Sequence, residues 1–195
     1  MNHTVVMLSR PGNSLGKRRL LAWGVFGVSA LAVSASQTVA FTVSYFLRQR
    51  DLLRLTMLGV AAVFGVLLLD RLLAARTTWK PHTLLPSAIG TTALAYEVLA
   101  SANPAEALHG VEFFALAVLA HRALLIDTRG LLAYLFTVTV VAAYGLADEL
   151  IQGTNPLRRF DWADVYLNAR VALFSTLTIC GLALRPFGEP APDDE

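Results

Sequence analysis

Six long apolar stretches constrain the fold of this chain more than any other feature of its sequence. They cover residues 20–47, 53–74, 83–101, 107–126, 131–151 and 162–184. An α-helix needs about 20 mainly apolar residues to cross a bilayer, and it satisfies its backbone hydrogen bonds without water. Transmembrane strands would instead alternate in polarity over segments of about ten residues. The sequence therefore predicts an all-α, polytopic transmembrane helix bundle of about six spans.

The composition agrees with a membrane protein and excludes several other classes. Only 15% of the residues are charged and 55% are hydrophobic, whereas soluble domains carry about 25% charged residues. Such a chain lacks the polar material to coat a soluble globule, so membrane lipids are its expected surroundings. The net charge of +2 predicts no nucleic-acid partner, and the single cysteine, Cys180, cannot form an intramolecular disulfide.

The basic residues predict how the chain is oriented. With six spans both termini lie on one side, which collects ten basic residues against six on the other side. The positive-inside rule then places both termini in the cytoplasm. Four parts are expected along the chain: a cytoplasmic basic N-terminus (1–19), two transmembrane helices (20–75), a four-helix transmembrane unit (83–184) and a disordered acidic tail (185–195).

Polar residues of the last three spans are expected to converge at the non-cytoplasmic face, because the fourth span begins there, the fifth ends there and the sixth begins there. Helical spacing puts Glu149 and Gln152 on one face of the fifth span. It also puts Asp161, Asp164 and Asn168 on one stripe of the sixth. The predicted pocket residues are His109, Glu149, Gln152, Arg158, Asp161, Asp164 and Asn168.

These residue types suggest distinct chemical roles. Arg158 can hold a phosphate or carboxylate through two parallel hydrogen bonds. His109 and Glu149 can move a proton, so they are the candidate catalytic acid and base. Asp161, Asp164 and Glu149 could hold a divalent cation through oxygen ligands, but we assign no metal and no cofactor. The residues leave open whether any reaction is catalysed. Ligand binding is assigned to Gln152, Arg158, Asp161, Asp164 and Asn168.

A purely structural role is the alternative for most of this set, His109 included. Arg158, Asp161 and Asp164 would then form a loop held by ion pairs and a helix cap. Glu149 and Gln152 would meet lipid headgroups at the end of a span.

The order of these residues resembles the VanZ-like family of bacterial integral membrane proteins. After His109 the sequence has E-x-x-Q at Glu149–Gln152, a P-x-R turn at Pro156–Arg158, and D-x-x-D-x-x-x-N over Asp161–Asn168. The match covers roughly residues 83–184. It departs from the family at Val171, where a glycine is frequent, and in lacking Asp-Lys before the histidine. The resemblance implies a role in the bacterial cell envelope, and some relatives are linked to glycopeptide-antibiotic resistance.

Two functions of different classes follow from these observations. The first is recognition of an anionic envelope lipid or related ligand by the outer-face pocket, with a role in the envelope or in antibiotic tolerance. The second is a non-catalytic accessory or assembly subunit of a larger membrane protein complex. Polar residues in the middle of the first span, among them Ser34, predict that this span packs against protein. A transporter or flippase is less well supported, because no inverted repeat or broken-helix pair is found.

Overall fold

The computed structural model describes residues 12–47, 73, 81–100, 104–155, 158–182 and 184, with side chains for 14–35, 73, 82–100, 110–155, 158–182 and 184. The described residues contain helices, turns and loops and no strand, which confirms the all-α prediction for them. The predicted second span, 53–74, lies outside the described residues apart from Leu73. The helices are α1 (Gly12–Leu47), α3 (Pro81–Ala100), α4 (Pro104–Leu124), α5 (Leu131–Gln152) and α6 (Trp162–Ile179).

The local sequence explains where several helices begin. Pro81 and Pro104 are the first residues of α3 and α4, where the missing backbone N–H loses no helical hydrogen bond. Asp161 is the N-cap of α6, and its carboxylate accepts a hydrogen bond from the Ala163 amide at 2.8 Å. Gly130 precedes α5 with a φ of 62°, a conformation that glycine adopts without strain.

Two helix boundaries differ from the sequence-based expectation by more than three residues. α1 begins at Gly12 rather than at 20, so part of the expected basic N-terminus, 1–19, is helical. Hydropathy marks only the apolar part of a helix, and the helix continues through charged residues beyond it. α6 ends at Ile179 rather than at 184, because residues 180–182 form turns with hydrogen bonds from each amide to the carbonyl three residues earlier. The expected acidic tail, 185–195, lies outside the described residues.

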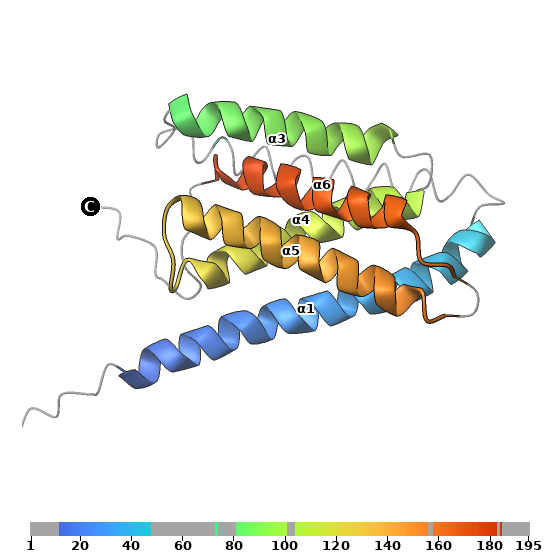
Figure 1. Ribbon diagram of the computed structural model, residues 1–195, viewed down its shortest axis with the longest axis horizontal. Helices are drawn as coiled ribbons and strands as arrows, with labels where there is room; N and C mark the ends of the chain where they lie inside the picture. The colour runs from blue at the N-terminus through green and yellow to red at the C-terminus, as the bar shows by residue number, and fades with distance from the viewer. Residues whose placement is uncertain are drawn as a thin grey trace, which may run out of the picture.

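The helices pack around α4 and α6. α6 contacts α3, α4 and α5, while α4 also contacts α1, α3 and α5. α1 and α3 lie on opposite sides of the other three helices (Figure 1). We call the end of the molecule that holds the last turn of α5, the following loop (153–155 and 158–161) and the start of α6 the polar end. The opposite end, which holds the α4–α5 turn (125–130), is the turn end.

The contact between α3 and α6 depends on small residues. A Cβ atom at Gly90 would lie 2.5 Å from the backbone nitrogen of Thr178 and 2.6 Å from the backbone oxygen of Phe174. One turn earlier on α3, the Ser87 hydroxyl donates a hydrogen bond to the carbonyl oxygen of Thr178 at 3.0 Å. The two helices therefore approach closely enough for a side chain to bond the facing backbone.

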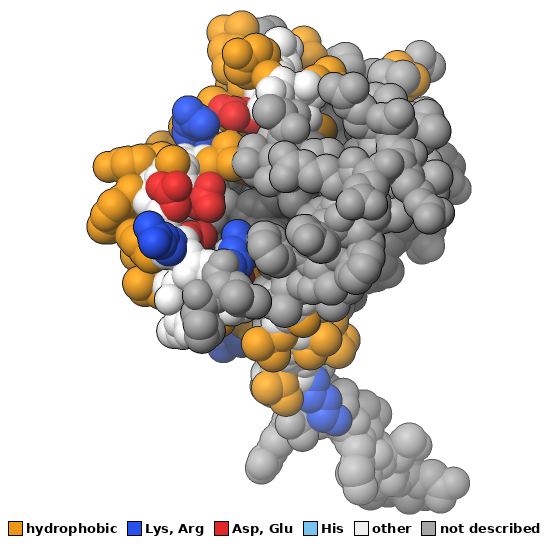
Figure 2. Space-filling model, turned by 90° about the vertical axis from the view of Figure 1, so that its right-hand side faces the viewer, with side chains coloured by type: hydrophobic (Ala, Val, Ile, Leu, Met, Phe, Trp, Pro, Cys, Tyr) orange, Lys and Arg blue, Asp and Glu red, His pale blue; other side chains and the backbone are white. Residues whose placement is uncertain are grey.

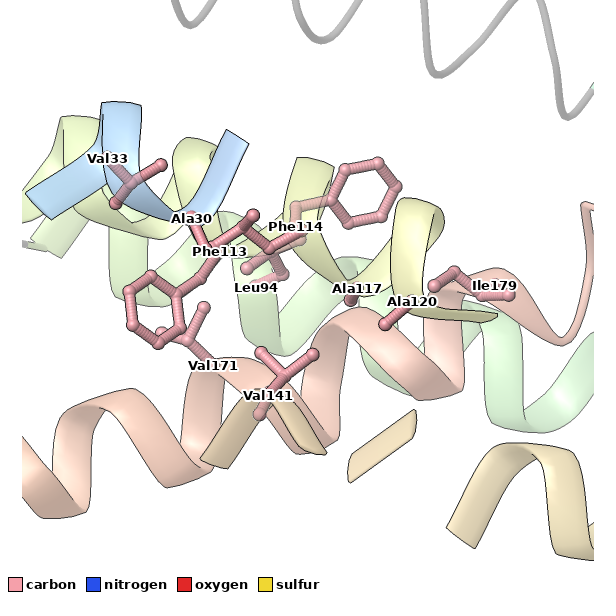
Figure 3. Close-up of a cluster of buried hydrophobic side chains, with 12 residues drawn as sticks. Ala30, Val33, Leu94, Phe113, Phe114, Ala117, Ala120, Val141, Val171 and Ile179 are labelled. Carbon is pink, nitrogen blue, oxygen red and sulfur yellow. The ribbon is translucent and has the colours of Figure 1, made fainter. Parts of the chain in front are cut away.

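A hydrophobic core joins all five described helices (Figure 3). α4 contributes most of it, which agrees with the central place of this helix in the bundle. The buried core residues are Ala30, Val33, Leu94, Phe113, Phe114, Leu116, Ala117, Ala120, Val141, Val171, Ala172 and Ile179.

Polar groups lie inside the bundle while many large apolar side chains lie on its surface. The buried polar residues are Ser87, His121, Thr137, Asp148, Glu149, Asn168, Ser175, Thr176 and Thr178. Exposed large hydrophobic residues occur on several helices, for example Leu20, Leu31, Leu85, Leu99, Leu131, Leu150 and Leu173. Exposed apolar surface of this extent is typical of a face that meets lipid or another protein.

Two helical segments are long and apolar enough to cross a membrane. Among the described residues they are Ser14–Ala35, within α1, and Leu131–Gln152, which is α5. Length and composition thus support a membrane location on these two helices, and the larger number of spans stays a prediction.

Candidate functional site

The polar end gathers charged side chains from α5, the loop after it and α6. Figure 2 views this end and shows acidic side chains together, with basic side chains beside them and hydrophobic ones around them. The chain reverses direction here, because α5 ends at Gln152 and α6 begins at Trp162. Residues near these two helix ends are therefore brought together.

Glu149 forms the central contact of the polar end. Its side chain is only 2% exposed, and its Oε1 atom accepts a hydrogen bond from the backbone amide of Asp161 at 2.8 Å. Arg158 and Asp164 lie close enough to the Glu149 carboxylate to interact with it electrostatically. The structure thus brings four of the predicted pocket residues near one another. Glu149 links the last turn of α5 to the N-cap of α6.

Asn168 lies deeper along the α5–α6 interface. It is buried, and its Nδ2 atom donates a hydrogen bond to the backbone oxygen of Gly145 at 3.3 Å. A Cβ atom at Gly145 would lie 2.6 Å from the Asn168 Cβ and 3.0 Å from the Phe113 ring. Asn168 therefore packs directly against the backbone of α5 at a position where only glycine leaves room.

Gln152 forms a hydrogen bond with Asp148 of the same helix. Its side-chain amide donates a hydrogen bond to Asp148 Oδ2 at 2.6 Å. The spacing of four residues along α5 makes this contact possible. The sequence analysis placed Gln152 on one helix face with Glu149 and did not consider Asp148 as a partner. The polar end thus has two carboxylates on α5 with separate partners.

Asp148 joins α5 to α1 in a polar network that sequence reasoning did not include in the site. The fully buried Asp148 accepts a hydrogen bond from the Ser34 hydroxyl of α1 at 2.6 Å. Ser34 Oγ also lies 2.8 Å from the Tyr144 hydroxyl, which donates to the carbonyl oxygen of Ala30 at 2.6 Å. The prediction that Ser34 faces protein is confirmed. A polar residue inside an apolar span was the signal that could have found this network.

His109 occupies the second turn of α4, but its side chain lies outside the described residues. Within the part of the chain that the structure describes, no three His, Cys, Asp or Glu side chains are arranged to hold a metal ion. The described chemistry of the polar end is therefore that of hydrogen-bonded carboxylates with arginine nearby, suited to binding a polar group or accepting a proton.

A second buried polar contact lies at the turn end. His121 of α4 stacks on the Tyr134 ring, with ring centroids 4.6 Å apart, and its Nδ1 atom lies 2.9 Å from Thr137 Oγ1. The Thr137 hydroxyl donates its hydrogen to the Ala133 carbonyl at 2.7 Å, so the His121 Nδ1–H is the donor to Thr137. The sequence analysis assigned His121 no role. A hairpin centred on the α4–α5 turn brings residues equidistant from it together, which is the signal that could have found the contact between His121 and Tyr134.

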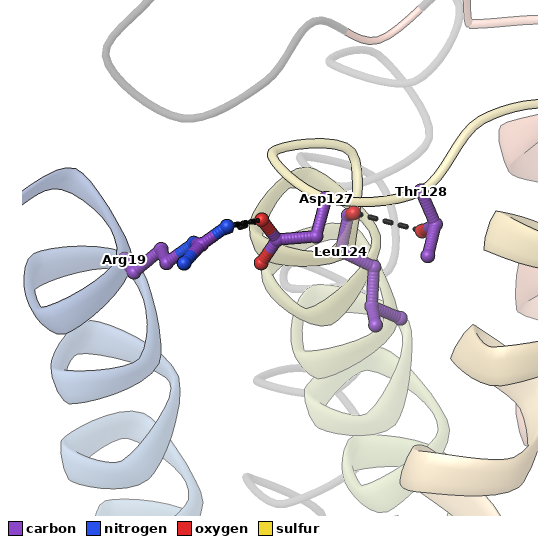
Figure 4. A network of polar contacts seen from close by, with 4 residues as sticks. All are labelled: Arg19, Leu124, Asp127 and Thr128. Carbon is purple, nitrogen blue, oxygen red and sulfur yellow. Dashed lines mark hydrogen bonds and ion pairs between the residues drawn. The ribbon is translucent and has the colours of Figure 1, made fainter. Parts of the chain in front are cut away.

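The turn end is also held at its surface. Arg19 of α1 forms an ion pair with Asp127 of the α4–α5 turn, with its Nε and Nη2 atoms both donating to Asp127 Oδ1 (Figure 4). The Thr128 hydroxyl donates to the Leu124 carbonyl at 2.8 Å and closes the end of α4. The beginning of α1 and the α4–α5 turn therefore lie at the same end of the molecule.

Three comparisons with known proteins found no relative of this chain. No family model matches the chain, and neither a curated protein nor a solved structure matches it.

Proposed function

We propose that this chain is a VanZ-like protein of the bacterial inner membrane whose polar end recognises an anionic envelope-lipid headgroup or a related ligand. It has six spans, with both termini in the cytoplasm, so the polar end faces outward. Arg158 contacts the anion, and Gln152, Asp161, Asp164 and Asn168 shape the site. His109 and Glu149 are the acid and base of any proton transfer.

The distribution of polarity supports the membrane part of this proposal. Asp148 and Glu149 are buried inside the bundle, while leucines such as Leu20 and Leu131 are exposed. Hydrocarbon favours this arrangement, because ionisable groups in a membrane protein face the protein interior or a wet cavity. The candidate spans in α1 and α5 agree with it.

One observation carries the binding part of the proposal. The buried Glu149 carboxylate holds the Asp161 amide at 2.8 Å, and Arg158 lies within electrostatic reach of the same carboxylate. This contact fixes the loop that bears Arg158 relative to α5. Arginine binds phosphate through two parallel hydrogen bonds, which supports assigning the anion contact to Arg158.

Replacing Arg158 tests the proposal. We expect Arg158→Gln to weaken retention of an anionic lipid by the purified full-length chain and to reduce any envelope or antibiotic-tolerance phenotype. Arg159→Gln is the matched control, because Arg159 is the exposed neighbour in the same loop. The proposal fails if Arg158→Gln and Glu149→Gln both express well and both keep full lipid retention and phenotype.

A second candidate function, an accessory subunit of a membrane complex, is favoured by the outer face of α1. This face has an open groove lined by Lys17, Leu20, Leu21, Gly24, Val25, Val28 and Ser29. Glycine and serine allow another helix to approach closely in a membrane. Purification in a mild detergent separates the two functions: a stoichiometric protein partner supports the subunit, and a monodisperse chain that retains lipid supports headgroup recognition.

A further inference from the structure

A groove on the outward face of α6 has no part in the polar-end site. The lining residues that the structure describes share this one helix face at spacings of three and four residues. They are Ala163, Tyr166, Ala169, Arg170 and Leu173. The groove has a volume of about 620 Å³, within the range of about 300–1,000 Å³ that is usual for small-molecule sites. Its two alanines leave room beside one guanidinium and one phenol.

Arg170 contacts a carboxylate on the inner side of its guanidinium group and is exposed on the outer side. Its Nε atom lies 3.2 Å from Oε1 of Glu97 on α3, and the side chains of Arg170 and Glu97 are 56% and 17% exposed. The carboxylate is thus the inner partner, and the guanidinium faces outward from the bundle. A guanidinium has five N–H donors in a planar fork, so one contact through Nε leaves donors for a second anion.

The depth of Arg170 makes this exposure costly in a membrane. Arg170 lies eight residues beyond Trp162, the first residue of α6, which is about 12 Å along the helix axis. An exposed arginine at that depth meets the hydrocarbon region, where a charge is expensive unless it finds a polar partner. The exposed Tyr166 lies one turn closer to the interface, where an amphipathic ring is favoured.

We propose that this groove binds one anionic phospholipid from the surrounding bilayer. The phosphate lies against the outward edge of Arg170 and within reach of the Tyr166 hydroxyl. An acyl chain follows Ala169 and Leu173 along α6. Charge selects the occupant, because Arg170 is the exposed member of its ion pair and the rest of the lining is mainly apolar. The inference rests on the membrane location in the proposed function, and not on ligand binding by Arg158.

Lipid titration of the full-length chain in detergent, followed by native mass spectrometry, tests the site. We expect the chain to retain phosphatidylglycerol more strongly than phosphatidylcholine, and inorganic phosphate not to displace it. Arg170→Gln should weaken phosphatidylglycerol retention about tenfold, as expected for the loss of a hydrogen bond to a charged group. Arg159→Gln is the control and should bind as the wild type does. Phosphate competition would show that a free anion, and not a lipid, is the occupant, and would overturn the proposal.

Arg170→Gln leaves Glu97 without its cation and could lower lipid retention by destabilising the fold. A second variant therefore separates loss of lipid binding from loss of folding. Ala169→Phe keeps both charges and fills the groove, so it should weaken retention of the lipid as well. Wild-type retention by both Arg170→Gln and Ala169→Phe overturns the inference. A copurifying protein or second copy of the chain that Ala169→Phe removes also overturns it, in favour of a protein interface.

The failure of this site can be told apart from the failure of the proposed function. Leu173→Cys in a Cys180→Ser background places the single thiol of the chain in the groove. If a membrane-impermeant maleimide labels this thiol rapidly in intact membranes, α6 faces water and the membrane placement itself is wrong. If the thiol is protected while Arg170→Gln binds lipid normally, only the groove inference fails.

Discussion

The Glu149 carboxylate accepts a hydrogen bond from the Asp161 backbone amide at 2.8 Å, which fastens the end of α5 to the N-cap of α6. The contact gives Glu149 a structural role beside the acid–base role proposed for it. Variants that differ only in hydrogen-bonding capacity separate the two roles.

Glu149→Gln keeps an oxygen that can accept from Asp161, so we expect it to unfold like the wild type. Glu149→Ala leaves the Asp161 amide without this acceptor and should lower the free energy of unfolding by about 1–3 kcal/mol. Thermal unfolding in a fixed detergent measures both. A stable Glu149→Gln variant that no longer binds lipid would assign the carboxylate to the site, while an equally stable Glu149→Ala variant would contradict the fastening contact.

The hydroxyl of Ser34 is expected to hold α1 against α5. Ser34→Ala removes the donor at 2.6 Å from the fully buried Asp148 and should cost about 1–3 kcal/mol of stability. Ser29→Ala, in the outer groove of the same helix, is the control and should have little effect. Equal midpoints of thermal unfolding for the two variants would contradict the α1–α5 network.

Two glycines in apolar helices should respond in opposite ways to alanine. Gly90→Ala forces a Cβ to within 2.5 Å of the Thr178 backbone nitrogen, and overpacking of this kind costs about 1–3 kcal/mol. Gly24→Ala meets nothing within 4 Å and should stabilise α1 by about 0.5–1 kcal/mol, because alanine is the better helix former. Unfolding midpoints that move in the same direction would contradict the close approach of α3 and α6.

Thr137 and Thr139 provide a matched test of the turn end. Thr137→Val removes the hydroxyl 2.9 Å from the buried His121 Nδ1 atom and should lower the free energy of unfolding by about 1–3 kcal/mol. Thr139→Val removes an exposed hydroxyl that bonds only its own helix, to the Leu135 carbonyl, and should not destabilise the protein. A stable Thr137→Val variant would show that the His121 contact adds nothing to folding.

Periodicity and capping rules predicted the elements but not most of their partners. The cap at Asp161 is local, since its carboxylate reaches an amide two residues away, and the sequence predicts it. The contact of Ser34 with Asp148 spans 114 positions and depends on how α1 lies against the bundle. A sequence can indicate that Ser34 faces protein, because hydrocarbon disfavours it, but not which carboxylate it meets.

The candidate site shows the same limit. Chain reversal between α5 and α6 brings Glu149 and Asp161 together, as expected for neighbouring helix ends. Helical spacing placed Gln152 on one face with Glu149, whereas its side chain bonds to Asp148, which also accepts a hydrogen bond from Ser34 of α1. The contact of His121 with Thr137 follows from the hairpin geometry of α4 and α5, which single-helix patterns do not contain.

Two of the hydrogen bonds of α5, one toward each of its ends, have a consequence for motion within the bundle. Thr137 holds His121 near the turn end, and Glu149 holds Asp161 at the polar end, about 18 Å further along the helix axis. A rotation of α5 by one residue, about 100°, would break both contacts at once. α5 therefore couples the two ends of the molecule, because a rotation of this helix that opens the polar end also breaks the buried contact at the turn end.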